Sequence, residues 1–241
     1  MKQLQMHYRL LVTLLLFTIS VQAQRERYEH NSSWNTLSIK MDVKERLFVR
    51  SEFNFRRTNF IKDWEQIVLR PSIEYRLDKS ITAATGYSYI KNYSYSNFST
   101  PLDFKENNLW QQLFIQHSIN QFEISHRLRF EERFRETIDS TDNRHIISKT
   151  DYSGRLRYRL IITIPLFSAD NISVLAYDEV FLDFQKRFQP QKIDQNWIFL
   201  GLRFRESEHI TISSGFHRIN IPRENSSITN NIWETSITYT L

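Results

Sequence analysis

The sequence predicts an all-β protein, a single closed antiparallel transmembrane β-barrel of about 10–12 strands, with 12 favoured. Short periplasmic turns and longer extracellular loops would join the strands. Apolar and polar residues alternate with a period of two from Trp34 to the end of the chain, as in strands with two different faces. Many of these runs reach the roughly 9–11 residues that a tilted transmembrane strand needs. The connections alternate between short and long, which is typical of outer-membrane barrels.

The first 23 residues are predicted to be a cleaved signal peptide. Lys2 and Arg9 precede the apolar run LLVTLLLFTISV, and VQA before Gln24 has the small-x-small form of a cleavage site. The apolar run is shorter than the roughly 20 residues of a membrane-spanning helix. We therefore expect residues 1–23 to be removed on export and residues 24–241 to form one outer-membrane barrel domain.

Composition excludes several classes of protein. The formal net charge is +5, and loss of the two positive charges of Lys2 and Arg9 leaves +3. A chain this weakly basic is not expected to bind nucleic acid. Cysteine is absent, so an exported protein of this kind holds together without disulfides and carries no lipid on cysteine.

Eleven alternating runs are predicted to be strands, and residues 25–30 to add a short twelfth strand, because bacterial barrels usually have an even count. The runs are 34–42, 46–57, 64–77, 80–92, 107–118, 121–136, 151–164, 171–184, 194–206, 209–221 and 229–241. The short connections are expected near 43–45, 78–79, 120, 166–170 and 207–208. The longer ones are expected at 58–63, 94–106, 137–150, 185–193 and 223–229.

Arginine and glutamate dominate the polar face of several runs. In 121–136, Leu128 and Phe130 share one face while Arg129 and Glu131 share the other. Opposite charges on neighbouring strands can pair across a sheet. We expect a charge ladder along the lumen, formed by Arg70, Glu74, Arg76, Glu123, Arg127, Arg129, Glu131, Arg133, Arg135, Arg155, Arg157, Arg159, Arg203 and Arg205.

Alternation alone does not decide whether the apolar face meets lipid or a soluble core. Strand length, loop alternation, the two-signed charged face and aromatic residues near strand ends favour outer-membrane lipid. The aromatic residues expected in girdles are Trp34, Trp64, Tyr93, Trp110, Tyr152, Phe184, Trp197, Trp233 and Tyr239. The alternate C-terminal residues Trp233, Thr235, Ile237, Tyr239 and Leu241 resemble the final-strand signal read by the barrel-insertion machinery.

Three polar residues fall in the outward register: His126, Glu132 and Asp178. A charge on the lipid face costs most at the bilayer centre and least near the interface. We therefore expect Glu132 to lie near a rim. The pattern gives no account of Asp178.

Two stretches, SEFNFRR at 51–57 and HRLRFEERF at 126–134, resemble the bacterial outer-membrane barrel family catalogued as domain of unknown function 2490. The signal peptide and the early Trp34 fit the same family, and the resemblance covers about 34–241. The residues that match its H-R-[LI]-R-x-E-x-R-F motif are His126, Arg127, Arg129, Glu131, Arg133 and Phe134. The resemblance implies a barrel in the bacterial outer membrane and carries no activity with it.

Three functions remain open. The first is a narrow passive channel or a surface scaffold, with a lumen lined by arginine and glutamate. Paired charges with little open bore are favoured over a pore for small anionic solutes, because a barrel of this size is narrow. The alternatives are a membrane-embedded lipid hydrolase and a soluble exported β-barrel that binds an apolar ligand.

No catalytic, cofactor-binding or metal-binding residue is predicted. His117–Ser118 and Ser125–His126 are adjacent pairs, and adjacent residues of a strand point to opposite faces, so neither pair forms a dyad. Asp142, Asn143 and His145 could hold a hard cation, but such residues are also ordinary loop formers.

Overall fold

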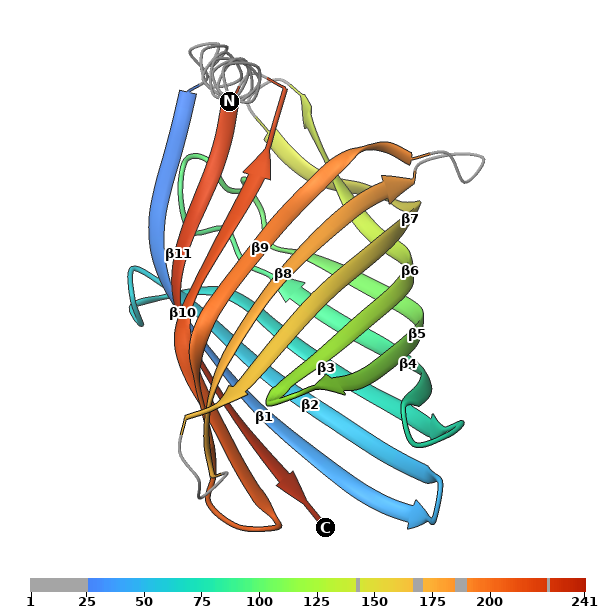
Figure 1. The fold of residues 1–241 in the computed structure, drawn as a ribbon. Coiled ribbons are helices and arrows are strands. Elements are labelled where there is room, and N and C mark those ends of the chain that lie inside the picture. The colour runs from blue at the N-terminus through green and yellow to red at the C-terminus, as the bar shows by residue number, and fades with distance from the viewer. Residues whose placement is uncertain (1–25, 142–143, 167–170, 185–189, 225) are drawn as a thin grey trace, which may run out of the picture.

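The computed structural model describes residues 26–141, 144–166, 171–184, 190–224 and 226–241, and in these ranges the chain forms eleven β-strands. The strands close into a barrel in which each pairs with the next along the chain and the last pairs with the first (Figure 1). They are β1 (Glu26–Lys44), β2 (Leu47–Thr58), β3 (Asp63–Arg76), β4 (Ile81–Asn92), β5 (Phe104–Ile119), β6 (Phe122–Thr141), β7 (Arg144–Pro165), β8 (Ile172–Phe184), β9 (Pro190–Arg205), β10 (Ile210–Pro222) and β11 (Ser226–Thr240). The predicted all-β closed barrel is confirmed, with 11 strands in place of the favoured 12. The described residues include no helix that is long and apolar enough to cross a membrane.

The seam of the barrel explains the odd count. β1 and β11 run parallel, in register from Glu26↔Ser226 to Lys40↔Thr240. An odd number of strands that alternate in direction must close with one parallel pair. The separate strand expected at 25–30 is not found, because residues 26–30 are the first part of β1.

The two ends of the barrel differ. The turns 45–46, 77–80, 120–121 and 206–209 lie at the end where β11 finishes, here named the short-turn end (Figure 1). The opposite end, named the loop end, carries residues 59–62 and 93–103. The predicted loop over 137–150 is wrong for its described residues, because β6 and β7 stay paired as far as Thr141↔Arg144.

A two-stranded ribbon therefore projects from the loop end. Pairing of β5 with β6 ends at Arg135, and pairing of β7 with β8 begins only at Gly154. Between these points, residues 136–141 and 144–150 pair with each other alone. We name these residues the ribbon, and all of those on its β7 side are exposed.

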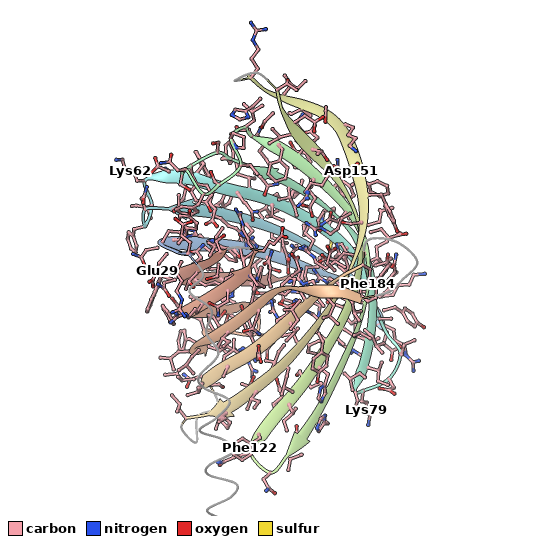
Figure 2. The ribbon with its side chains drawn as sticks, turned by 90° about the horizontal axis from the view of Figure 1, so that it is seen from above. Glu29, Lys62, Lys79, Phe122, Asp151 and Phe184 are labelled. Atoms are coloured by element: carbon pink, nitrogen blue, oxygen red, sulfur yellow. The ribbon has the colours of Figure 1, made fainter. Side chains whose placement is uncertain are left out.

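The wall is one sheet thick, and its two faces have opposite character. On β6, Leu128 is 45% exposed on the outer face, whereas Arg129 is 4% exposed on the inner face. Side chains project from both faces of the wall (Figure 2). Large apolar residues form an outer apolar belt that includes Leu37, Met41, Phe53, Phe55, Leu69, Ile73, Tyr75, Ile115, Leu128, Tyr158, Leu200, Leu202, Phe204, Phe216, Ile237 and Tyr239.

Charged residues on the outer face mark the edge of the apolar belt that is nearer the loop end. Arg57 lies ten residues after Leu47, Lys91 ten after Ile81, and Glu132 ten after Phe122. Ten residues is the length that a tilted strand needs to cross the hydrocarbon core of a bilayer. The apolar belt thus begins at the short-turn end and stops below the loop end.

Asp178 lies in a polar row rather than alone. It pairs with Ile198, which pairs with Arg218, which pairs with Asn231, so three of the four residues in this row are polar. Asn196 donates a hydrogen bond of 2.6 Å to the Asp178 carboxylate. On this side of the barrel, the row marks the change from apolar to polar outer residues.

His126 is the polar residue that lies inside the apolar belt. Its Nδ1 lies 2.8 Å from the Tyr158 hydroxyl, and its ring stacks on His117 with centroids 5.4 Å apart. These neighbours give the imidazole a polar partner on the outer face, so it need not meet solvent.

Two facing glycines admit an aromatic ring to the interior. Gly201 on β9 pairs with Gly215 on β10, and a Cβ at Gly201 would lie 2.7 Å from the Phe199 ring. The Phe199 ring stacks on Tyr177 with centroids 5.0 Å apart. A side chain at Gly201 would push this pair out of place, and one at Gly215 would meet the backbone of β9.

We expect Gly215→Ala to lower the free energy of unfolding by about 1–3 kcal/mol, the usual range for an overpacked site. A Cβ there would lie 2.4 Å from the backbone of Leu200 and Gly201, which cannot move aside easily. Gly154→Ala is the control, because its nearest neighbours would lie at 3.4 Å. Denaturant unfolding of the purified barrel measures both. Equal losses for the two variants would contradict the close approach.

Candidate functional site

The register of β6 and β7 places like charges opposite one another. Arg127 pairs with Arg159, and Arg129 pairs with Arg157. Like charges directly opposite in a sheet destabilise it unless counter-charges are near. The next pair, Glu131 with Arg155, supplies one carboxylate, and β8 supplies the second at Glu179, opposite Arg159.

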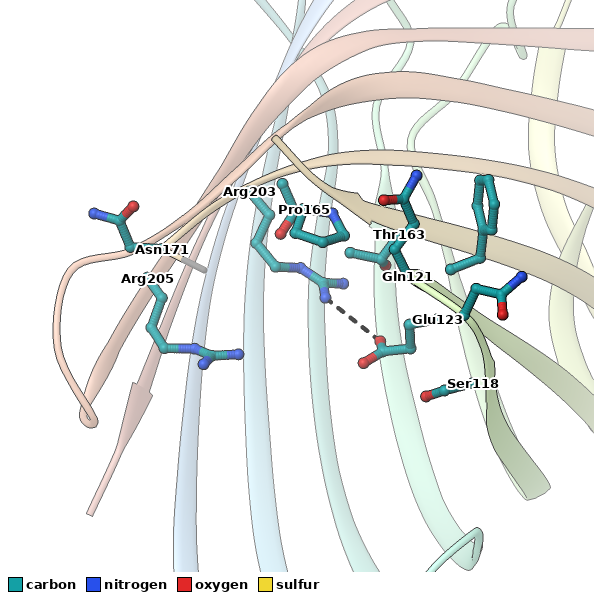
Figure 3. Close-up of a pocket in the computed structure, with 11 residues that line it drawn as sticks. Ser118, Gln121, Glu123, Thr163, Pro165, Asn171, Arg203 and Arg205 are labelled. Carbon is teal, nitrogen blue, oxygen red and sulfur yellow. Dashed lines mark ion pairs between the residues drawn. The ribbon is translucent and has the colours of Figure 1, made fainter. Parts of the chain in front are cut away.

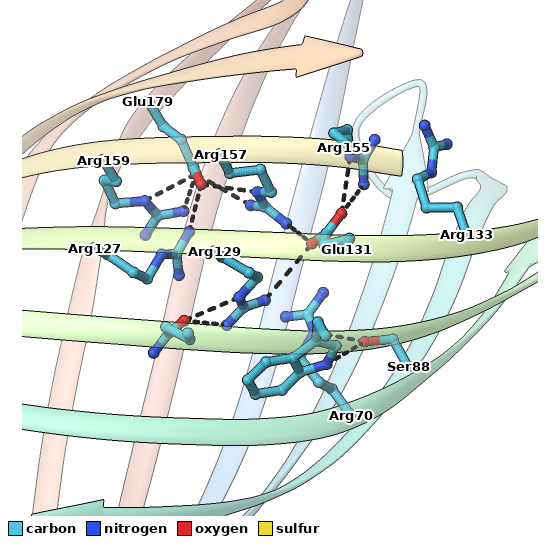
Figure 4. A network of polar contacts seen from close by, with 12 residues as sticks. Arg70, Ser88, Arg127, Arg129, Glu131, Arg133, Arg155, Arg157, Arg159 and Glu179 are labelled. Atoms are coloured by element: carbon cyan, nitrogen blue, oxygen red, sulfur yellow. Dashed lines mark hydrogen bonds and ion pairs between the residues drawn. The ribbon is translucent and has the colours of Figure 1, made fainter. Parts of the chain in front are cut away.

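Glu179 is the centre of the interactions on β8. It is 0% exposed and accepts bonds from Arg127 Nη2 at 2.6 Å, Arg157 Nε at 2.8 Å and Arg159 Nη2 at 2.6 Å (Figure 4). A buried carboxylate is tolerated only when it is paired and hydrogen-bonded. Three guanidinium groups from two neighbouring strands meet that requirement.

Glu131 joins the same set of interactions. It accepts a bond from Arg155 Nη2 at 2.6 Å and another from Arg157 Nη1 at 2.7 Å. Arg157 therefore links Glu131 to Glu179 (Figure 4). We name the connected residues the charged network: Arg127, Arg129, Glu131, Arg155, Arg157, Arg159 and Glu179.

The charged network is anchored on both sides. On β5, Gln112 accepts bonds from Arg129 at 2.7 and 2.9 Å, and the Arg129 guanidinium lies 4.1 Å from the centre of the Trp110 ring. Towards the loop end, Arg133 makes a bidentate pair with Glu106 at 2.7 and 2.9 Å. Bidentate pairs fix orientation as well as charge, so these arginines are held in place.

Aromatic residues fill the other half of the interior. We name Trp34, Tyr177, Phe181, Trp197, Phe199 and His217 the aromatic cluster, all of them buried. The His217 ring packs edge-on against Trp34 and Trp197 at 5.3 and 5.1 Å, and its Nδ1 lies 2.5 Å from Glu234. The Arg157 guanidinium lies 4.3 Å from the centre of the Phe181 ring, so the aromatic cluster and the charged network are in contact.

The remaining residues of the expected ladder lie outside the charged network. Arg70 pairs with Glu52 at 2.8 Å, Glu74 pairs with Arg50 at 2.6 Å, and Arg203 lies 3.8 Å from Glu123. Arg76, Arg135 and Arg205 are exposed. The structure thus brings the ladder residues of β6 and β7 together and leaves others separate.

Sequence reasoning missed several charged residues of the interior. Glu52, Glu106 and Glu179 pair with arginines of the ladder, and Arg50 pairs with Glu74. Glu65 and Glu234 lie beside His30 and His217, and Arg56 was not predicted either. Glu179 sits between Tyr177 and Phe181 on the inner face of β8, so the charge pattern is interrupted there. The excess of arginine over glutamate in β6 and β7 is the signal that could have indicated carboxylates on a neighbouring strand.

The expected aromatic girdles need correction. Trp34, Trp110 and Trp197 are buried inside the barrel, whereas Trp64, Tyr152, Trp233 and Tyr239 are exposed on its outer face. Their position near a strand end did not determine their face, because one step along a strand reverses it.

The interior is hollow towards the short-turn end, and a separate cavity of about 370 Å³ at the loop end, lined by Thr58, Tyr95 and Phe98 among others, shares no lining residue with that hollow. Thr58, Asn92, Glu106 and Ile228 lie near the loop end and are all buried. Towards the short-turn end, two cavities of about 220 and 230 Å³ share the lining residues Glu52, Arg70, Arg127 and Ile161. The arrangement is a blind hollow that the charged network and the aromatic cluster close.

The Ser125–His126 pair is divided between the two faces of the wall, as strand alternation predicts. Ser125 is buried in the interior, while His126 lies on the outer face against Tyr158. Asp142 and Asn143 of the possible cation site lie outside the described residues, and Ser140 Oγ lies 2.8 Å from Nδ1 of His145. Within the described ranges, no three acidic, histidine or cysteine side chains gather as a metal site.

Comparison with known proteins gives one match. A family model described as "Protein of unknown function (DUF2490)" matches residues 31–230, which confirms the resemblance carried by the HRLRFEERF stretch. Neither the curated proteins nor the solved structures contain a match to this chain.

We expect Glu179→Gln to lower the free energy of unfolding by about 3–5 kcal/mol, because it leaves three buried arginines without their counter-charge. Glu132→Gln is the matched control on the outer face, and we expect a change within about 0.5 kcal/mol. Denaturant unfolding of both variants is the measurement. A Glu179→Gln barrel as stable as the unmodified chain would show that the charged network is not held by this carboxylate.

Proposed function

This chain belongs to the DUF2490 family of proteins of unknown function, and we propose that it is a bacterial outer-membrane β-barrel that does not conduct ions. In this proposal it serves as a scaffold that presents the ribbon at the cell surface. The observation that carries the proposal is the division of its faces, with the apolar belt outside and the charged network inside.

The apolar belt supports a lipid environment. Its side chains are exposed around the barrel, and soluble monomers rarely expose apolar patches larger than a few hundred Å². Closure pairs every strand with two neighbours, which satisfies backbone groups that lipid cannot. The predicted signal peptide at 1–23 and the outward residues Trp233, Ile237 and Tyr239 fit export and delivery by the barrel-insertion machinery.

A soluble barrel for an apolar ligand is less well supported. Such a barrel would place apolar residues around its cavity and charges towards water. Here most residues that line the two cavities are polar, eight arginines among them, while leucine and isoleucine of the same strands are exposed. The arrangement is the reverse of what an apolar ligand requires.

The charged network argues against an open channel. The buried carboxylate of Glu179 binds Arg127, Arg157 and Arg159. The Arg133–Glu106 pair lies between these residues and the loop end. Buried pairs of this kind are costly to break, since each lost partner leaves an uncompensated charge. An open pore would require these side chains to move out of the barrel interior.

The ribbon supports the scaffold. Residues 136–141 and 144–150 pair only with each other and project past the wall (Figure 1). Ile146 and Ile147 are exposed there, beyond the edge of the apolar belt marked by Glu132. In the proposed orientation the loop end faces outwards, so the ribbon is the part most accessible to another cell or molecule.

We expect Leu128→Arg to lower the free energy of unfolding in phospholipid by about 2–4 kcal/mol, the cost of a basic group on a lipid face at mid-bilayer. Phe122→Arg is the matched control on the same face of β6, next to the turn 120–121, where the cost falls to about 0–1 kcal/mol. If the barrel were soluble, both residues would face water and both variants would change stability by less than about 0.5 kcal/mol. Unfolding in vesicles separates the two cases.

Planar-bilayer recordings of the purified, heat-modifiable barrel are expected to show no stable conductance steps, because the charged network closes the interior. A porin of known conductance, added to the same bilayer, controls for insertion. Sustained ohmic conductance from the purified chain would replace the scaffold with a narrow channel.

A further inference from the structure

Three cavities adjoin one another in the hollow that opens at the short-turn end. A mouth cavity of about 220 Å³ is lined by Ser118, Glu123, Arg203 and Arg205 among others (Figure 3). Arg203 also lines the central cavity, which shares Glu52, Arg70 and Arg127 with the second cavity. We name the three cavities together the vestibule, which opens between the short turns and ends at the charged network.

Arginine outnumbers carboxylate along the vestibule. The central and second cavities are lined by eight arginines, namely Arg50, Arg56, Arg70, Arg127, Arg129, Arg157, Arg159 and Arg203, and by three glutamates, Glu52, Glu74 and Glu234. Glu179 does not line either cavity and is fully buried among the guanidinium groups that it binds. A solute in the vestibule therefore meets positive charge before negative charge.

Several of these arginines keep unused bonding capacity. Nε of Arg127 and Nη1 of Arg129 are buried without a hydrogen-bond partner, and Nη1 lies 3.9 Å from Glu131. Within the described ranges, Arg56 donates to neutral Asn54 and Gln66 and has no carboxylate within ion-pair distance. Buried donors without partners cost free energy, and an anion accepting from them would remove that cost.

One wall of the central cavity is aromatic. Trp34, Tyr177, Trp197 and Phe199 line it, and Tyr177 and Phe199 stack with ring planes 9° apart. Tyr177 is covered by Phe199 and by the Arg159 guanidinium, which lies 4.0 Å from the centre of the Tyr177 ring, so these rings offer the cavity their apolar edges. The cavity of about 220 Å³ holds roughly seven waters, enough for a small molecule and too little for a lipid chain or a polymer.

We propose that the vestibule binds a small organic anion that enters from the short-turn end. Its phosphate or carboxylate group lies at Arg127 with Arg70 and Arg203, and its apolar group lies against the edges of the Tyr177 and Phe199 rings. The site goes beyond the scaffold role and does not depend on it, because a barrel closed by the charged network can bind a solute without passing it.

Phenyl phosphate is the probe, and the full barrel in detergent is titrated by calorimetry and by tryptophan fluorescence, since Trp34 and Trp197 line the cavity. We expect saturable binding that is tighter than that of inorganic phosphate, with no binding of phenol. Absence of saturable phenyl phosphate binding would overturn the site. Equal affinity for inorganic phosphate would overturn the role of the aromatic wall.

Arg127→Gln is expected to weaken phenyl phosphate binding at least tenfold, the usual effect of losing a charged hydrogen-bond donor. Arg135→Gln is the matched control on the same strand, where the exposed Arg135 lies towards the loop end, beyond the charged network. Arg203→Gln, at the partly exposed mouth, serves if the Arg127 variant does not fold, and the same tenfold loss is expected. Equal affinities of these variants and the Arg135 control would exclude the proposed position of the anion.

Discussion

Two carboxylates hold five arginines in the interior of this barrel, and most other features of the structure depend on that pairing. Glu131 and Glu179 lie between strands whose register sets arginine against arginine. Alternation sends every second residue of a strand to the inner face, so a strand with apolar outer residues must place its charges inside. The charges can remain there only as pairs. The closed interior, the blind vestibule and the outer apolar belt are consequences of that one requirement.

Much of the fold could be predicted because it depends on local pattern. A period of two in LRFEERF fixes which residues of β6 share a face, and the turns near 45, 78, 120 and 207 interrupt that period visibly. The inner positions of Arg127, Arg129 and Arg157 follow from the same parity. Strand number was harder to predict, because residues 26–30 continue the alternation of β1 without a turn between them.

The other features of the structure could not be predicted without knowing which strands are neighbours in the barrel. Glu179 is a single acid between Tyr177 and Phe181, and its partners lie on β6 and β7, which the sequence of β8 does not reveal. Trp34 and Trp197 contact each other in the interior, with ring centroids 5.4 Å apart, although β10 and β11 separate their strands β1 and β9 in the wall. The ribbon was taken for a loop because Ser140, Thr141 and Asn143 are polar, and exposed ribbons need no apolar face.

The parallel seam has a topological consequence. In an even-stranded barrel both terminal strands leave the wall on the same side, whereas here Glu26 and Thr240 lie at opposite ends. If the loop end faces the outside of the cell, the start of β1 is carried through the membrane while the finish of β11 stays behind. Assembly must then move the amino-terminal segment across the bilayer before the ring can close. A peptide joined ahead of β1 would be displayed beside the ribbon, and one joined after β11 would stay in the compartment where insertion began.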